Sequence, residues 1–256
     1  MGLCIRALVG WFLTTGYIYD WLLSAFLILI SSFIPIYTIS PINRYYALND
    51  ASLQYPLKNS TIPNYALYIL VFIFPAVVTG LYCLIKSKSY LEWHHICLTY
   101  AEGFALTTSF KRWMNLVGRY RPIWLALLSD TGSHKDGRLS YPSGHSAYMF
   151  FSMTILSLFL IGKTNLFIQS SQAHFAVAFI CLMPLMLATF VAVSRIANYK
   201  HNPSDVNAGC FVGMACGAFC YFLNYHHPFG VKSGSIRTRD PCEAKEKAFT
   251  EQSDVF

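Results

Sequence analysis

The sequence predicts an all-α membrane protein in which six transmembrane helices pack into one bundle. Of its 256 residues, 55% are hydrophobic and only 12% are charged, and this charged share is about half of that in an ordinary soluble domain. Apolar stretches long enough to cross a bilayer, which takes about 20 residues, recur along the chain. They run over residues 21–38, 63–86, 91–110, 144–162, 173–196 and 204–223.

The early stretches differ in how clearly they predict a membrane helix. Residues 1–20 do not resemble a cleaved signal peptide, because the apolar stretch after them is too long and no small-residue cleavage site ends it. Stretch 21–38 is therefore interpreted as a retained anchor. Stretch 91–110 is the weakest of the six, because two glutamates and two histidines interrupt it. One of them, Glu102, is a functional candidate by its place in a membrane helix, although pairing inside the bundle or a near-interface position explains it as well.

The later stretches carry clearer signals. The fourth begins directly after Ser143, which is a good helix N-cap. The sixth contains Gly209, Gly213 and Gly217, a doubled G-x-x-x-G pattern, for which close packing within the bundle is favoured over dimerisation. The sequence does not indicate an oligomeric state.

Beyond the sixth stretch the chain turns polar. Residues 224–256 mix Lys, Arg, Asp, Glu, Ser and Gly without apolar periodicity, a composition that favours disorder. The sequence thus predicts a membrane domain over residues 1–223 and a disordered cytosolic tail over residues 224–256.

Cysteine use and net charge exclude two other classes of protein. Six of the eight cysteines fall inside predicted membrane helices, where they behave as small apolar residues, so no disulfide framework is expected. The net charge of +7 is divided between loops on both sides of the membrane. Because no single basic face results, the sequence does not favour nucleic-acid binding.

An even number of helices places both chain ends on one side of the membrane. Loops 39–62, 111–143 and 197–203 then share the other side, so all polar motifs of the chain can meet there. Basic residues divide almost evenly between the two sides and do not set the orientation. The sequon Asn59-Ser60-Thr61 lies on the motif side and favours a lumenal or extracellular site with cytosolic chain ends.

The segment Tyr141-Pro142-Ser143-Gly144-His145 is the first candidate for chemistry. Its proline stops a preceding helix and Ser143 caps the next one, so the N–H groups of the first turn form an anion site at the positive end of the helix dipole. His145 falls in that same turn. Taken alone, the segment fits a capped helix with an interfacial histidine equally well.

A second candidate segment joins the fifth and sixth stretches. It reads Ser194-Arg195, then His201, then Asp205, with the spacing S-R-x5-H-x3-D. Asn202 can cap the sixth helix, and Asp205 falls at the third position, from which a carboxylate reaches back toward the cap. Such a carboxylate is expected to hold one ring nitrogen of His201 as N–H and leave the other free as a nucleophile or base.

Two arginines complete the pattern. Arg121 and Arg195 carry planar forks suited to phosphate oxygens, and both stand at helix ends. Other basic residues at the membrane edge are assigned to lipid headgroups: Arg112, Arg119 and Lys200. Two imidazoles, two guanidiniums, a carboxylate and a Ser-Gly turn are what breaking a phosphomonoester needs without a metal.

These segments resemble the type-2 phosphatidic acid phosphatase superfamily, and within it the integral-membrane lipid phosphate phosphatases. The signature of that family is K-x6-R-P, then P-S-G-H, then S-R-x5-H-x3-D. The matching residues here are Arg121-Pro122, Pro142-Ser143-Gly144-His145, Ser194-Arg195, His201 and Asp205. The resemblance covers nearly the whole chain except the tail, and it implies the same six-helix fold.

One position departs from the family pattern. The first lysine of the signature should stand at position 114, where this chain has Met114. Lys111 lies one helical turn earlier and could reach the phosphate from the same face, and Arg119 is a second candidate. Alternatively, the lysine function is lost and activity is reduced.

The resemblance implies a mechanism. His201 attacks phosphorus while Asp205 orients it, and His145 protonates the departing alkoxide and then activates water. The phosphate-binding residues implied are Arg121, Ser143, Gly144, Arg195 and Lys111. No metal-ligand cluster is visible in the sequence, so a metal-independent reaction with no cofactor is expected.

The leading function is hydrolysis of a lipid phosphomonoester such as phosphatidate, diacylglycerol pyrophosphate, lysophosphatidate or a sphingoid phosphate. The partners are thus a phospholipid substrate and the membrane. Two alternatives stay open: phosphotransfer to a lipid acceptor, as in sphingolipid synthases of related architecture, and a catalytically silent protein that binds lipid phosphates.

Overall fold

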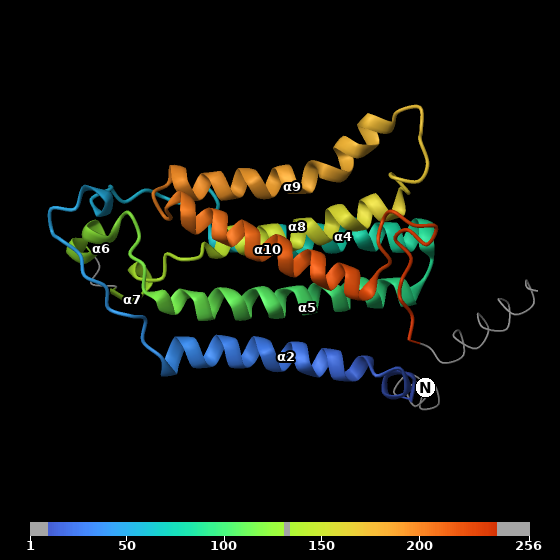
Figure 1. Cartoon of the computed structure of the whole chain (residues 1–256), viewed down its shortest axis with the longest axis horizontal. Helices are drawn as coiled ribbons and strands as arrows, with labels where there is room; N and C mark the ends of the chain where they lie inside the picture. Colours follow the sequence, from blue (N-terminus) through green and yellow to red (C-terminus); the bar gives the residue numbers. More distant parts are fainter. Residues whose placement is uncertain (1–9, 131–133, 240–256) are drawn as a thin grey trace, which may run out of the picture.

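The computed structural model describes residues 10–130 and 134–239. Over these residues the chain forms six long helical segments that run along the long axis of the molecule (Figure 1). They are α2 (Tyr17–Phe33), the segment Asn64–Ser87 with α3 (Asn64–Tyr68) and α4 (Phe74–Tyr82), α5 (Tyr90–Met114), α8 (Gly144–Lys163), α9 (His174–Ala197) and α10 (Pro203–Asn224). Two short helices, α6 (Trp124–Asp130) and α7 (His134–Gly137), lie in one connection. Each long segment lies within a few residues of a predicted apolar stretch, so the predicted all-α bundle is confirmed.

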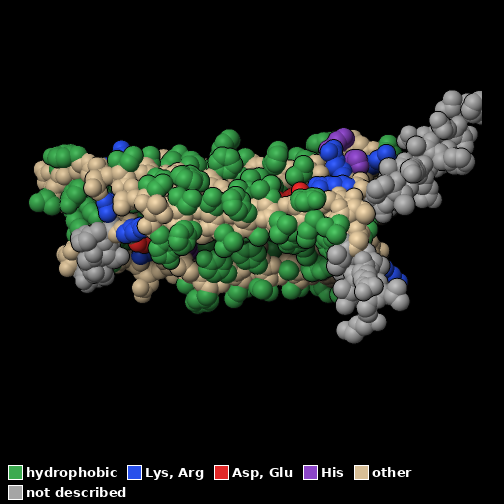
Figure 2. Space-filling model, turned by 90° about the horizontal axis from the view of Figure 1, so that it is seen from below, with side chains coloured by type: hydrophobic (Ala, Val, Ile, Leu, Met, Phe, Trp, Pro, Cys, Tyr) green, Lys and Arg blue, Asp and Glu red, His purple; other side chains and the backbone are tan. Residues whose placement is uncertain are grey.

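The bundle has the apolar surface of a membrane protein. Four of the described segments are long and apolar enough to cross a bilayer: Asn64–Ser87, α8, α9 and α10. Helix α2 has only 17 residues, which is short for a membrane span, and α5 is interrupted by the glutamates and histidines noted above. The number of six membrane crossings therefore stays a prediction. On the face shown in Figure 2, hydrophobic side chains cover the middle of the molecule, charged side chains gather toward its two ends, and histidines are visible at one end.

Helix α8 lies at the centre of the bundle and contacts α5, α9 and α10. Its side chains Phe151 and Ile155 are fully buried. Glycines of α10 let the two backbones approach: a β-carbon at Gly213 would lie 2.4 Å from the carbonyl oxygen of Ala147, and one at Gly217 would lie 2.5 Å from that of Phe151. The G-x-x-x-G pattern therefore serves packing within the bundle.

The segment 225–239 packs against the bundle end at which the described chain begins and ends, and this differs from the disorder predicted beyond the sixth helix. Tyr225 is fully buried. The ammonium of Lys163, at the end of α8, donates to the carbonyl of Gly234 at 2.6 Å. The segment is held by hydrogen bonds and has no apolar periodicity. Its polar composition therefore led to the expectation of disorder. Residues 240–256, the rest of the predicted tail, lie outside the described residues.

Two acidic residues of α5 are paired near this terminus end. Glu92 forms an ion pair with Lys163, and Glu102 accepts a hydrogen bond from the side-chain amide of Asn224. Of the explanations considered for Glu102, pairing inside the bundle is the one that the structure supports.

The opposite end of the bundle carries the loops that hold the motif segments. After α5 the chain turns at Gly118, which has φ of +68°. A β-carbon there would lie 2.0 Å from the carbonyl oxygen of Ile42, so both the conformation and the close approach require glycine. The amide of Ile42 in turn donates to the carbonyl of Leu116 at 3.0 Å, which ties the first motif-side loop to the second.

Candidate active site

The three motif segments come together at the end of the bundle away from the described chain ends (Figure 1). They surround a polar cavity of about 390 Å³. The predicted site residues that line it are Lys111, Arg121, Gly144, His145, Arg195 and His201. Ser143 and Asp205 are not among the lining residues.

His201 is placed by a tight turn between α9 and α10. Tyr199 adopts a left-handed conformation with φ of +56°, and the amides of Lys200 and His201 both donate to the carbonyl of Arg195, at 3.0 and 3.3 Å. The His201 side chain is 5% exposed. Its Nδ1–H donates to the carbonyl of Ser140 at 2.8 Å, which leaves Nε2 without a proton in the neutral ring. An imidazole in this state can act as a nucleophile.

The surroundings of His201 keep its ring neutral. Burial lowers its pKa well below 6.5, and the positive charge of Arg121 lowers it further, whereas the hydrogen bond to the carbonyl of Ser140 opposes the shift. The unprotonated Nε2 is therefore present throughout the neutral pH range.

Asp205 lies behind His201 but does not hold its ring directly, which corrects the expectation from the sequence. Its Oδ2 is 4.0 Å from Nδ1 of His201. The carboxylate instead accepts from the hydroxyl of Ser140 at 2.6 Å and from the amide of Asn202 at 2.9 Å, the second bond being part of the predicted capping box. Its other oxygen pairs with Arg119 at 2.7 Å. Both oxygens of Asp205 are therefore already hydrogen-bonded, and the imidazole of His201 donates to the nearer carbonyl of Ser140 instead.

His145 and Gly144 enter the cavity from the first turn of α8. The Nε2–H of His145 donates to the carbonyl of Ile62 at 3.2 Å, which anchors the ring to the loop before α3. The positive end of the α8 dipole lies at this same turn. A second imidazole thus borders the cavity that His201 also lines.

Ser143 differs from its predicted role as a phosphate ligand. Its side chain is fully buried and caps α8, because its Oγ accepts from the amide and the hydroxyl of Ser146 at 3.5 and 3.1 Å. Its own amide donates to the carbonyl of Asp205 at 2.9 Å. Capping and packing against α10 engage the groups that were expected to face phosphate.

Two guanidinium groups border the cavity as predicted from the motifs. Arg195 is 2% exposed, and its Nε and Nη2 donate to the hydroxyl of Ser194 at 3.2 and 3.1 Å. Arg121 donates to the carbonyl of Asp136 at 3.1 Å and pairs with its carboxylate at 3.3 Å. The carboxylate of Asp136 is mostly exposed, so water weakens this pair. A phosphate group can therefore compete for Arg121.

At the departure from the family pattern, the structure brings Lys111 rather than Met114 or Arg119 to the cavity. A β-carbon added at Gly144 would lie 3.1 Å from Cε of Lys111 and 3.6 Å from its Nζ. Asn115, in the amide orientation in which its oxygen faces a donor, accepts from this Nζ at 3.2 Å. The ammonium is thus held beside the start of α8.

The lining of the cavity is strongly basic. Its cationic side chains are Lys111, Arg112, Arg121, Arg195 and Lys200. Among the described lining residues, Asp136 alone supplies a carboxylate. This surplus of positive charge favours a dianionic ligand, and two imidazoles beside it provide the groups that phosphoryl transfer needs.

Sequence reasoning missed the roles of Ser140, Asn115 and Asp136. Ser140 precedes a recognised motif by one residue, but nothing in a sequence marks a backbone carbonyl as the partner of a distant histidine. Asn115 stands four residues after Lys111, a helical spacing that could have suggested contact. Asp136 follows no motif and carries no such signal.

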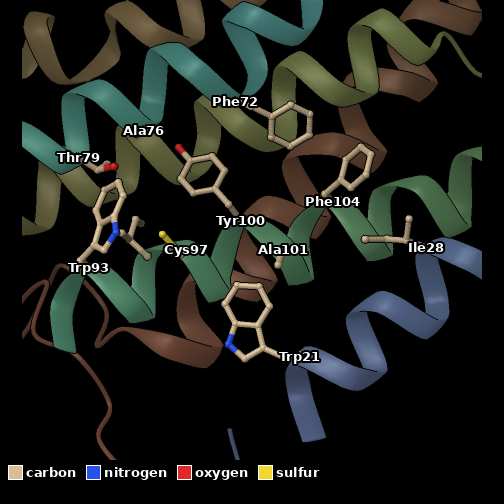
Figure 3. A pocket seen from close by; sticks show the side chains of 11 residues that line it. Trp21, Ile28, Phe72, Ala76, Thr79, Trp93, Cys97, Tyr100, Ala101 and Phe104 are labelled. Carbon is tan, nitrogen blue, oxygen red and sulfur yellow. The ribbon is translucent and has the colours of Figure 1, made fainter. Parts of the chain in front are cut away.

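A cavity of about 430 Å³ lies elsewhere, between α2, α4 and α5 (Figure 3). Its lining is apolar and aromatic and includes Trp21, Phe72, Trp93, Tyr100 and Phe104. No charged side chain is among its described lining residues, so it does not suit a phosphate group.

Known proteins resemble the chain over most of its length. A PA-phosphatase related-family protein of Dictyostelium discoideum is 35% identical over 240 residues, which cover 90% of this chain and 87% of that protein. Lipid phosphate phosphatase 2 of Arabidopsis thaliana is 31% identical over 235 residues, with coverage of 83% and 79%. A probable diacylglycerol pyrophosphate phosphatase 1 of Schizosaccharomyces pombe is 25% identical over 202 residues, with coverage of 71% and 72%. No solved structure matches the chain.

The helical membrane bundle, the basic cavity and these relatives define a lipid phosphate phosphatase, a phosphoric monoester hydrolase that acts in a membrane. The chain belongs to the PAP2 superfamily, whose family model matches residues 92–228. The matched range contains α8, α9, α10 and all of α5 except its first two residues. It also contains every site residue predicted from the sequence, from Lys111 to Asp205.

Proposed function

We propose that the chain hydrolyses lipid phosphomonoesters without a metal ion, through a phosphohistidine intermediate on His201. The observation that supports this most is the 2.8 Å hydrogen bond from Nδ1 of His201 to the carbonyl of Ser140, because it leaves an unprotonated Nε2 in a basic cavity. Candidate substrates are phosphatidate, diacylglycerol pyrophosphate, lysophosphatidate and sphingoid phosphates.

In the first step, Nε2 of His201 attacks phosphorus in line with the oxygen that leaves. The bond between phosphorus and this oxygen breaks, and the oxygen takes a proton from the imidazolium form of His145, which the bound phosphate dianion favours and which thereby becomes neutral. Arg121, Arg195 and Lys111 hold the remaining phosphate oxygens and stabilise the charge of the transition state. The products of this step are the dephosphorylated lipid and a phosphohistidine.

In the second step, water replaces the lipid oxygen at the cavity. His145 takes a proton from the water, whose oxygen attacks phosphorus and breaks its bond to Nε2. Inorganic phosphate leaves, and His201 returns to its neutral form.

The test is an assay of purified protein in detergent micelles, with a panel of lipid phosphates and with EDTA present. We expect phosphate release with EDTA, loss of release in His201→Ala, and normal release in His174→Ala, which removes an exposed histidine at the other end of the bundle. Loss of activity on adding EDTA contradicts metal independence. Transfer of phosphate to a lipid acceptor instead of water identifies a transferase, and binding without turnover identifies a silent lipid-phosphate-binding protein.

We also propose that the cavity faces the lumen or the cell exterior and that both chain ends are cytosolic. In support, Asn59 of the sequon is exposed and its neighbour Ser60 lines the cavity. In this proposal residues 1–223 form the catalytic domain, on which 225–239 pack.

The test uses sealed microsomes that contain the protein with an epitope tag at its C-terminus. Protease added outside should remove the tag while the lipid phosphatase activity stays latent. Survival of the tag until detergent is added means that the orientation is inverted.

A further inference from the structure

A chain of hydrogen bonds behind His201 begins at Arg119, a residue that does not line the cavity. Its Nη1 donates to Oδ1 of Asp205 at 2.7 Å and to the hydroxyl of Ser204 at 2.6 Å. The Asp205 side chain is fully buried, and a buried carboxylate without a partner is strongly unfavourable. Arg119 is the cation that compensates its charge.

Ser140 connects this ion pair to the nucleophile. Its hydroxyl donates to Oδ2 of Asp205 at 2.6 Å, and its carbonyl accepts from Nδ1 of His201 at 2.8 Å. Its amide donates to the carbonyl of Arg119 at 3.0 Å. The carbonyl that orients His201 is therefore held in place by both members of the ion pair.

A competing acceptor lies close to the ring. Oδ2 of Asp205 is 4.0 Å from Nδ1 of His201. The carboxylate is kept from approaching the ring because Oδ2 accepts from Ser140 and Asn202 and Oδ1 pairs with Arg119. Once those bonds weaken, the carboxylate can turn toward the imidazole and rotate it away from the line of attack. A displacement of about 1 Å at a reacting group can lower a rate by about a hundredfold.

We propose that Arg119 and Ser140 are positioning residues for the His201 nucleophile and act on it through Asp205; this inference rests on the function proposed above. Neither side chain lines the phosphate cavity. Their loss should therefore lower kcat by about ten- to a hundredfold and leave KM almost unchanged. A residue that contacts the substrate phosphate changes KM as well.

The first experiment compares Arg119→Gln with Arg119→Lys. Glutamine removes the charge, whereas lysine keeps it and should restore part of kcat, because the guanidinium is one-third exposed and leaves room for another side chain. The matched control is Arg44→Gln, which removes an exposed guanidinium from the same end of the bundle. Single-turnover formation of the phosphoenzyme should slow in Arg119→Gln by the same factor as kcat.

The second experiment tests whether the two residues act through one path. Ser140→Ala alone should lower kcat, and the double variant with Arg119→Gln should lose less than the product of the two single effects. Thermal midpoints in detergent, measured for each variant, separate a loss of folded protein from a loss of rate per folded molecule.

Several outcomes overturn the proposal. An unchanged kcat in Arg119→Gln does so, as does a raised KM with normal kcat, or fully independent effects of the two substitutions. These are distinguishable from a failure of the proposed function, in which the unaltered protein itself forms no phosphohistidine.

Discussion

Two buried carboxylates at opposite ends of the bundle share a place in the first turn of a helix and differ in their surroundings. Asp205 lies in the first turn of α10 and Glu92 in the first turn of α5, and each is bonded to the capping residue of its helix. Each also pairs with a cation from another segment. These cations are Arg119 and Lys163, respectively.

The surroundings decide what each pair can do. Around Glu92 the charges balance, and Lys163 also binds Gly234, so the ion pair joins α5, α8 and the segment 225–239. Around Asp205 the neighbouring cavity has a surplus of cations and holds His201 at its edge. Of two carboxylates at helix starts, one thus serves packing and the other lies behind the proposed nucleophile, so a carboxylate at a helix start does not by itself indicate chemistry.

The largest effect is expected from His201→Ala at the chemical end. Loss of the nucleophile should lower kcat on the order of 10⁴-fold or more, measured as phosphate release from a lipid phosphate in micelles. The thermal midpoint should change little by comparison. A rate near that of the unaltered protein means that another group attacks phosphorus.

Lys163→Met should have the opposite profile at the terminus end. It leaves Glu92 buried without its cation, which should lower stability by about 3–5 kcal/mol, seen as a lower thermal midpoint in detergent with unchanged kcat per folded molecule. Lys86→Met, which removes an exposed lysine at the same end, is the matched control. Equal midpoints for the two variants contradict a packing role for the ion pair.

Lys111→Ala should produce an intermediate loss at the chemical end. A charge-assisted contact to phosphate is worth about 1.5–3 kcal/mol, so kcat/KM should fall by about ten- to a hundredfold. Met114→Lys in that background should restore much of the loss. If Lys111→Ala is silent and Met114→Lys alone raises activity, the lysine contact is absent from this protein; if neither changes the kinetics, the lysine is dispensable.

The smallest effect concerns pH. Since burial and the charge of Arg121 hold the pKa of His201 well below 6.5, protonation should remove the nucleophile only at acid pH. Arg121→Gln removes one positive neighbour, so the pKa should rise and the acid-side decline of kcat/KM should move to higher pH by less than about one unit. Burial remains in the variant, which limits the shift. A decline that moves to lower pH contradicts this assignment.

The sequence predicted the helices better than the contacts at their ends. Apolar stretches place α8, α9 and α10 within one or two residues, because burial in a bilayer demands long apolar runs. The capping box at Asn202 and Asp205 was also predicted correctly, since its spacing is local.

Contacts between segments distant in sequence were not predictable in the same way. Asp205 was expected to contact His201, but Ser140, which lies more than 60 residues earlier in the chain, takes that place. The fold of residues 225–239 was missed for the same reason, because Lys163 and Tyr225 hold it through partners that no local pattern marks.

The central claim is that His201 becomes phosphorylated, and trapping the phosphoenzyme tests it most directly. Protein carrying His145→Ala, which slows release of phosphate, is mixed with a radiolabelled substrate that has a good leaving group, quenched in base and analysed by peptide mass spectrometry. The account predicts an acid-labile label on the peptide that contains His201 and no label when His201→Ala is added. Label on another residue, or release of phosphate with no labelled protein at any time point, would contradict it.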